Sequence, residues 1–134
     1  MSELDQDRVF SVRESMQPSD GEPIRSVITE SEHAAVIVWH VKPGQSIQAH
    51  VHPSGQDTWT VLSGCGHYQL DDKGSSRLIS RGDVAVAPQG CVHGVSNDGA
   101  QPLVFVSVVA PAAAGYRQLD GEGSPVLLPG DHPA

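Results

Sequence analysis

Short apolar runs separated by turn residues dominate this sequence from Ile24 onward. The runs alternate apolar with polar residues, and glycine, proline or aspartate interrupts them about every eight to twelve residues. This spacing is typical of an all-β sandwich or barrel, and no segment carries the apolar repeat of a helix long enough to join a core. The pattern predicts strands at 24–29, 34–41, 46–52, 58–62, 66–70, 76–79, 84–87, 93–96 and 103–109, with a candidate edge strand at 126–128.

The chain is expected to form one folded unit with two flanking segments. Its 134 residues suffice to bury a core without disulfides or a structural metal. Residues 1–23 are polar and end in the turn SDGEP, which predicts an N-terminal arm ordered against the barrel or a second subunit. Residues 24–111 form the predicted barrel, and residues 112–134, broken by proline and glycine, form a C-terminal tail.

The charge balance argues against two classes of partner. Eight Lys and Arg against sixteen Asp and Glu give a net charge of −8 without a basic block, so nucleic acid is not an expected partner. The first residues lack the apolar segment of a signal peptide, and no run approaches the roughly 18 apolar residues of a membrane span. Cys65 and Cys91 lack a CxxC spacing. We therefore expect a soluble cytoplasmic protein with reduced cysteines and no membrane partner.

A pair of histidines at positions 50 and 52 gives the first functional signal. Two residues apart on a strand, His50 and His52 would leave the same face and could bind one ion together. Asp57 opens the next predicted strand, where it shares a face with Trp59 and Val61, so that a carboxylate would lie at a pocket floor and an indole in its wall. A single His-x-His pair also occurs by chance, so this motif requires structural context.

The spacing around these residues resembles the first motif of the cupin family. It reads Gly44, five residues, His50-x-His52, four residues, Asp57, six residues and Gly64. The family usually has Glu where this chain has Asp57. Because Asp is one methylene shorter, three arrangements remain open: direct ligation from a closer strand, ligation through a water, or a site of three histidines.

A second segment matches the second cupin motif at every fixed position. It reads Gly82, five residues, Pro88-x-Gly90, two residues, His93, three residues and Asn97. The resemblance covers about residues 36–111. It implies a double-stranded β-helix (jelly-roll) barrel of the RmlC-like cupin superfamily, similar to small single-domain bacterial cupins and commonly a homodimer. It also implies a metal held inside the barrel by the residues at 50, 52, 57 and 93.

Several further residues are candidates for the site or its pocket. Gln56 is an alternative to Asp57, although strand alternation points it the other way. His40 and His67 lie on predicted strands and could face the cavity as an acid or base near neutral pH. The predicted apolar pocket residues are Val38, Trp59, Val61, Val86 and Phe105. His33, His132, Tyr68 and Tyr116 receive no predicted role.

The ligand set suits several divalent ions, namely Fe, Mn, Ni and Zn. Four ligands close a tetrahedral zinc site but leave two positions open on an octahedral ion. Our first hypothesis is a metal-dependent oxygenase or isomerase that acts on a small, partly hydrophobic oxygenated metabolite rather than a phosphorylated sugar. A non-catalytic small-molecule binding or sensing protein is the second, and a metal-free cupin similar to sugar epimerases is the third.

Overall fold

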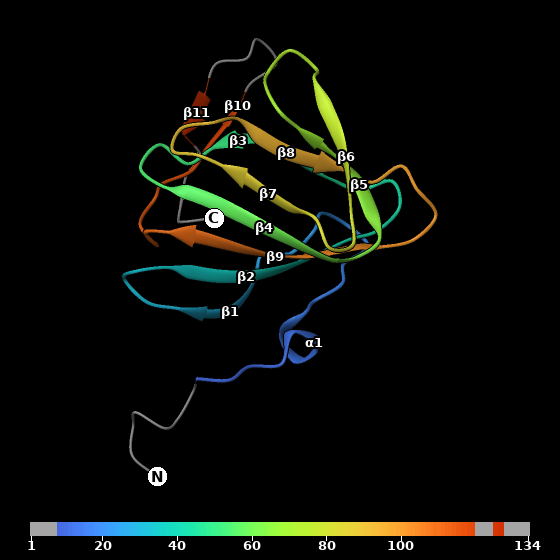
Figure 1. Ribbon diagram of the computed structural model, residues 1–134, viewed down its shortest axis with the longest axis horizontal. Coiled ribbons are helices and arrows are strands. Elements are labelled where there is room, and N and C mark those ends of the chain that lie inside the picture. The colour runs from blue at the N-terminus through green and yellow to red at the C-terminus, as the bar shows by residue number, and fades with distance from the viewer. Residues whose placement is uncertain (1–7, 120–124, 128–134) are drawn as a thin grey trace.

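A computed structural model describes residues 8–119 and 125–127, which form two facing antiparallel sheets (Figure 1). One sheet has the strand order β1-β2-β9-β4-β7, and the other has the order β11-β10-β3-β8-β5-β6. The elements are α1 (Val12–Ser15), β1 (Ser26–Glu30), β2 (Ala35–Val41), β3 (Ser46–Val51), β4 (Gln56–Ser63), β5 (Cys65–Gln69), β6 (Ser76–Ser80), β7 (Val84–Ala87), β8 (His93–Ser96), β9 (Leu103–Ala110), β10 (Arg117–Leu119) and β11 (Pro125–Leu127). The predicted all-β double-stranded β-helix is confirmed.

The predicted strands agree with the structure to within about two residues at each end. β11 is an edge strand, as predicted, and begins one residue earlier than expected. Two elements were not predicted: β10, and the single helical turn α1 in the N-terminal arm. Within the described residues no helix is long and apolar enough to cross a lipid bilayer.

The barrel interior is apolar over much of its length. Alternation along β4 and β9 turns Trp59, Val61, Leu103 and Phe105 inward, and each of these residues is buried. The rings of Trp59 and Phe105 stack with a centroid distance of 4.0 Å. Burial of such large side chains is the main favourable contribution to folding.

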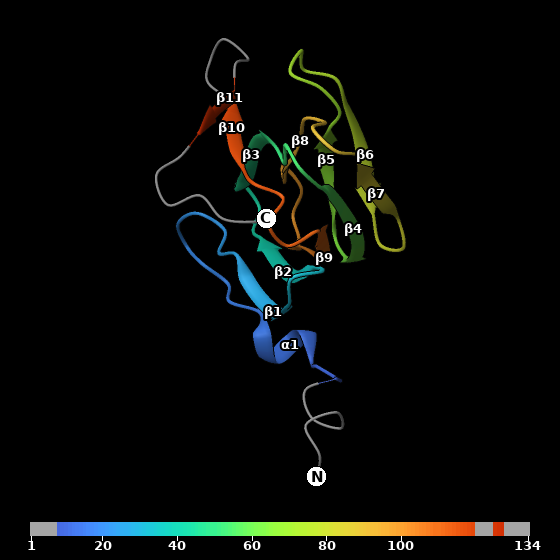
Figure 2. The same ribbon diagram turned by 90° about the vertical axis from the view of Figure 1, so that its left-hand side faces the viewer.

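Both flanking segments pack against the barrel. In the arm, Lys42 forms an ion pair with Asp20 at 2.5 Å, and the Gln45 side-chain amide donates to the carbonyls of Ser19 at 2.7 Å and Gly21 at 2.6 Å. Figure 2 shows α1 and the arm beside β1, and β10 beside β3. After β9, residues 112–116 cross to the other sheet, where β10 pairs with β3. Residues of the predicted tail therefore complete the second sheet.

Candidate metal centre

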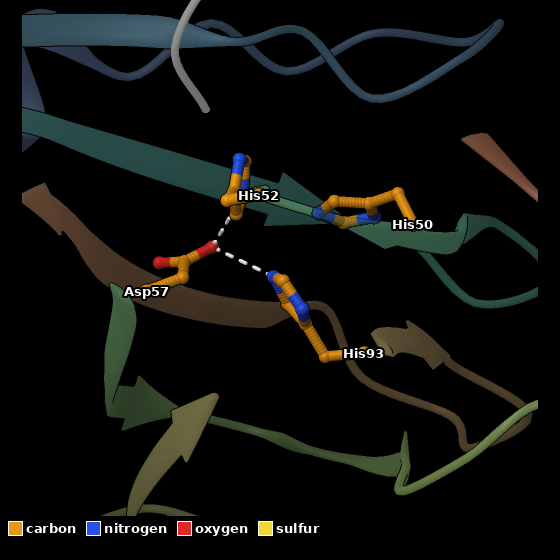
Figure 3. Close-up of side chains that lie close together, drawn as sticks. All are labelled: His50, His52, Asp57 and His93. Atoms are coloured by element: carbon orange, nitrogen blue, oxygen red, sulfur yellow. Dashed lines mark hydrogen bonds and ion pairs between the residues drawn. The ribbon is translucent and has the colours of Figure 1, made fainter. Parts of the chain in front are cut away.

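Three imidazoles and one carboxylate converge inside the barrel (Figure 3). The ligand atoms of His50, His52, Asp57 and His93 all lie within 4.8 Å of one another. Each of these four residues is buried, with at most 3% of its surface exposed. The four residues predicted from the two motifs thus come together in one buried cluster.

The two sheets contribute different chemistry to the cluster. His50 lies on β3, His52 directly follows that strand, and His93 begins β8, the neighbouring strand in the six-stranded sheet. The Cα atoms of His50 and His93 are direct partners in the β3–β8 pairing. Asp57 comes from β4 in the opposite sheet. The site therefore forms only when the two sheets face each other.

Each histidine is oriented by a backbone carbonyl. The Nδ1 atoms of His50, His52 and His93 lie 2.7, 2.7 and 3.0 Å from the carbonyl oxygens of Gln48, Gly115 and Cys91. A carbonyl only accepts hydrogen bonds, so each Nδ1 carries the proton and donates it. In the neutral imidazoles the Nε2 lone pairs then remain available, which is the arrangement typical of metal-binding histidines.

Asp57 is held between the imidazoles and a serine. Ser107, on β9, donates to Asp57 Oδ1 at 2.5 Å, while Asp57 Oδ2 lies 3.0 Å from His93 Nε2 and 3.3 Å from His52 Nε2. Burial alone would raise the pKa of Asp57, but the neighbouring His52 and His93 rings and the Ser107 hydroxyl hold it below its usual range. Asp57 is therefore a carboxylate at neutral pH.

The geometry of this cluster fits a divalent cation. His52 Nε2 is buried and makes no hydrogen bond, although it contacts Asp57 Oδ2. A cation shared by Asp57 Oδ2 and the Nε2 atoms of His52 and His93 would satisfy the buried carboxylate and the unpaired Nε2 atom together. Adjacent ligands bound at about 2.0–2.1 Å are separated by about 3.0–3.4 Å, which matches both of these contacts.

Burial keeps the His50 imidazole in the form that binds metal. Burial lowers the pKa of His50 to about 3, and the neighbouring His93 imidazole acts in the same direction. His50 is consequently neutral at physiological pH. A neutral imidazole is the ligand form that Fe, Mn, Ni and Zn require.

A segment outside the two motifs covers the histidines. We call residues 112–116 the strap. Its Gly115 carbonyl accepts from His52 Nδ1, and its Ala114 carbonyl accepts from the backbone N–H of Ser54 at 2.8 Å. The strap lies so close that a Cβ atom at Gly55 would be 2.4 Å from the Ala114 Cβ atom. The Tyr116 ring lies 5.0 Å from the His50 ring, between centroids.

The predicted pocket residues fall into two groups. Trp59, Val61 and Phe105 are buried in the barrel interior, and the Trp59 ring lies 5.8 Å from the His93 ring. Val38, His40, His67 and Val86 lie on the opposite faces of their strands, away from the cluster, although Val38 is fully buried there and His40 half-buried. His67 pairs with Asp98 at 3.1 Å, and Gln56 is exposed with its amide bonded to Thr58. Strand alternation directs these side chains outward.

Sequence reasoning missed two residues beside the cluster. Ser107 is the single polar residue in the strand LVFVSVVA and occupies an inward position. Strand alternation could have identified it as a polar residue facing the interior. Tyr68 also points inward, with its ring 6.5 Å from the His93 ring. Burial raises the pKa of Tyr68, and the charges of Asp57 and Cys91 raise it further, so its phenol stays protonated.

Comparison with known proteins identifies solved structures with the same fold. A protein from Klebsiella pneumoniae subsp. pneumoniae, described as uncharacterized and conserved with a double-stranded β-helix domain, is 51% identical, with a TM-score of 0.81. The similarity covers 84% of this chain and 97% of that one. An RmlC-like cupin from Desulfovibrio desulfuricans is 27% identical over 73% of this chain and 91% of its own, with a TM-score of 0.65.

The similarity to curated proteins is more partial. Germin-like protein 5-1 from Oryza sativa subsp. japonica is 30% identical over 96 residues, which are 68% of this chain and 37% of that protein. Auxin-binding protein ABP19a from Prunus persica is 33% identical over 58% of this chain and 39% of its own length. The chain therefore spans well under half the length of these relatives. The model of the cupin domain family matches residues 37–109, more than half of the chain, and the chain belongs to the cupin family.

Proposed function

We propose that this cupin is a metal-dependent enzyme that acts on a small oxygenated metabolite as an oxygenase or isomerase. One observation carries the proposal: three imidazoles and one carboxylate converge in a buried cluster. In each imidazole a backbone carbonyl binds Nδ1, which leaves Nε2 directed at the cluster. When bound there, a divalent ion would act as a Lewis acid on a carbonyl or enediol, or, as Fe(II), would supply redox chemistry with dioxygen.

The residues around the cluster have distinct roles in this proposal. Ser107 fixes the carboxylate rotamer of Asp57 through its hydrogen bond. Tyr68, still protonated at neutral pH, supplies a hydrogen-bond donor beside His93. The apolar side chains of Trp59 and Phe105 exclude water on the same side.

Metal content of the untagged protein tests the proposal directly. We expect elemental analysis to find about one Fe, Mn, Ni or Zn ion per chain, and His50→Ala to lose that ion. His33→Ala is the control and should retain it, because the His33 side chain is 85% exposed. Anaerobic loading with each ion, followed by oxygen-uptake and isomerisation screens, then tests catalysis. Tight binding of small molecules without turnover by any loaded form would instead support a binding or sensing function.

We also propose that the protein is a cytoplasmic homodimer formed through the outer face of the five-stranded sheet. Val84 and Val86 on β7 are 59% and 49% exposed there, and Leu62 on β4 is 40% exposed. Both cysteines are free, in keeping with a reducing compartment. Light scattering on a Val84→Glu, Val86→Glu double variant should report a monomer, whereas Leu78→Glu, on the opposite sheet, should leave the dimer intact. A monomeric parent protein would refute the dimer.

A further inference from the structure

A groove of about 320 Å³ opens on one side of the barrel, where the two sheets separate between β2 and β3. Trp39 on β2, Tyr116 of the strap and Gln118 on β10 form its walls, and Glu22 of the arm lies at its edge. The arm reaches this position because Asp20, Ser19 and Gly21 are anchored to Lys42 and Gln45. Segments distant in sequence therefore build this groove together.

The groove adjoins the metal centre directly. Gln118 is the cross-strand partner of His50, so both side chains lie on the inner face of the six-stranded sheet. Tyr116 lines the groove, and its ring lies 5.0 Å from the His50 ring and 6.1 Å from the His52 ring. The groove is thus an opening of the barrel interior, and the ring of Tyr116 separates it from the ligand histidines.

The chemistry of the lining points to a particular class of ligand. Two aromatic rings, from Trp39 and Tyr116, offer flat surfaces for C–H groups, while the amides of Gln48 and Gln118 can both donate and accept hydrogen bonds. Glu22 adds an acceptor, and among the described residues that line the groove none is a lysine or arginine. Because the whole chain carries a net charge of −8, anions are disfavoured here.

We propose that this groove is the substrate subsite of the metal centre and that it takes a neutral polyhydroxylated compound, such as a sugar or a hydroxyketone. The inference rests on the proposed function and specifies its substrate class. One face of the ligand lies against Trp39, its hydroxyl groups bond to Gln118 and Glu22, and its end passes Tyr116 toward the metal ligands. Tyr116 has to turn away from His50 for the ligand to reach them.

A second groove provides a control. It has a volume of about 250 Å³ and lies between β6 and β7, where it is lined by Tyr68, Arg77 and Asp83 among others. Tyr68 separates this groove from His93, as Tyr116 separates the first groove from His50. Arg77 and Asp83 place one cation and one carboxylate in its wall, so this groove, unlike the first, carries a positive charge.

The test measures binding of defined probes to the full chain in metal-free and zinc-loaded forms. D-Glucose, D-fructose and myo-inositol serve as neutral probes, with D-gluconate and D-glucose 6-phosphate as anionic comparators, all followed by saturation-transfer NMR and by tryptophan fluorescence. We expect at least one neutral probe to bind the metal-free protein at least fivefold more tightly than either anion. Gln118→Ala and Glu22→Gln should each weaken that binding at least fivefold, and Arg77→Ala should leave it unchanged.

Three results would overturn the proposal: no neutral probe binds, an anion binds the metal-free protein as tightly, or Gln118→Ala leaves binding intact. Trp39 contacts the core, so Trp39→Phe, which keeps an aromatic ring, is the variant for assigning the fluorescence change. Binding to the metal-free form is independent of metal content. Failure of the groove is therefore distinguishable from failure of the metal site, which elemental analysis and His50→Ala report separately.

Discussion

The two ends of the barrel interior differ in chemistry although the same strands line both. Along β4 and β9, Asp57 and Ser107 face the histidines, whereas the cross-strand partners Val61 and Phe105 pack in the hydrophobic core cluster. The apolar end contributes stability through burial. The polar end holds a buried Nε2 atom without a hydrogen bond and a carboxylate fixed beside two imidazoles, an arrangement that costs stability in the absence of a cation.

The largest effect on the apolar end should come from Phe105→Ala. Loss of a fully buried ring stacked on Trp59 should lower the free energy of unfolding of the metal-free protein by about 3–5 kcal/mol in chemical denaturation. Val104→Ala, at a half-buried position on the outer face of the same strand, should cost clearly less. Metal content under native conditions should not change in either variant. Equal losses for the two substitutions would contradict the distinction between the faces.

Ser107→Ala should affect the polar end selectively. Removal of the hydroxyl that orients Asp57 should weaken metal binding by about 10–100-fold, equivalent to roughly 1.4–2.7 kcal/mol, as found for partners that orient metal ligands. Competition with a chelator of known affinity measures this change. Ser80→Ala, at an exposed position, is the matched control. Unaltered metal affinity in Ser107→Ala would show that the hydrogen bond to Asp57 does not contribute.

Acid should destabilise the metal-free protein through the polar end. The unfolded chain takes up a proton at His50 near pH 6.5, whereas the folded chain does so only near pH 3, so the unfolded state binds more protons between these values. Stability should thus fall as pH falls, by about 2 kcal/mol between pH 7 and pH 5 from His50 alone. Asp57, whose pKa is also lowered, acts in the same direction below its usual pKa of 3.8.

Denaturation curves at both pH values measure this loss, and His50→Gln, which removes the titrating ring, should flatten the dependence. Phe105→Ala should lower stability equally at pH 7 and pH 5, because no titrating group changes at the apolar end. A slope that persists unchanged in His50→Gln would assign the acid sensitivity to another group.

Much of this architecture could be predicted because it depends on local patterns. Turn residues between alternating runs located nine strands, and the spacing of His50, His52, Asp57 and His93 identified the cluster. Asp57 left three arrangements open in the sequence. The structure places its carboxylate among the imidazoles, since β4 lies close enough for the shorter side chain to reach them.

Other features depend on contacts that no local pattern encodes. β10 is only three residues long, and it is a strand because it pairs with β3. Strand alternation predicts which residues lie on the same face of the strand as His40 or His67. It does not predict which of the two faces points into the barrel, because that depends on how the sheets stack. The position of Tyr116 over His50 likewise follows from the path of the strap rather than from its sequence.

The carbonyl that orients His52 belongs to Gly115, which lies 63 residues further along the chain. A chain truncated before the strap would retain all four ligand side chains but would lack the acceptor that selects the Nδ1-protonated form of His52. The metal centre is therefore complete only after the strap has docked against His52. High metal affinity thus reports the docking of a segment that supplies no metal ligand.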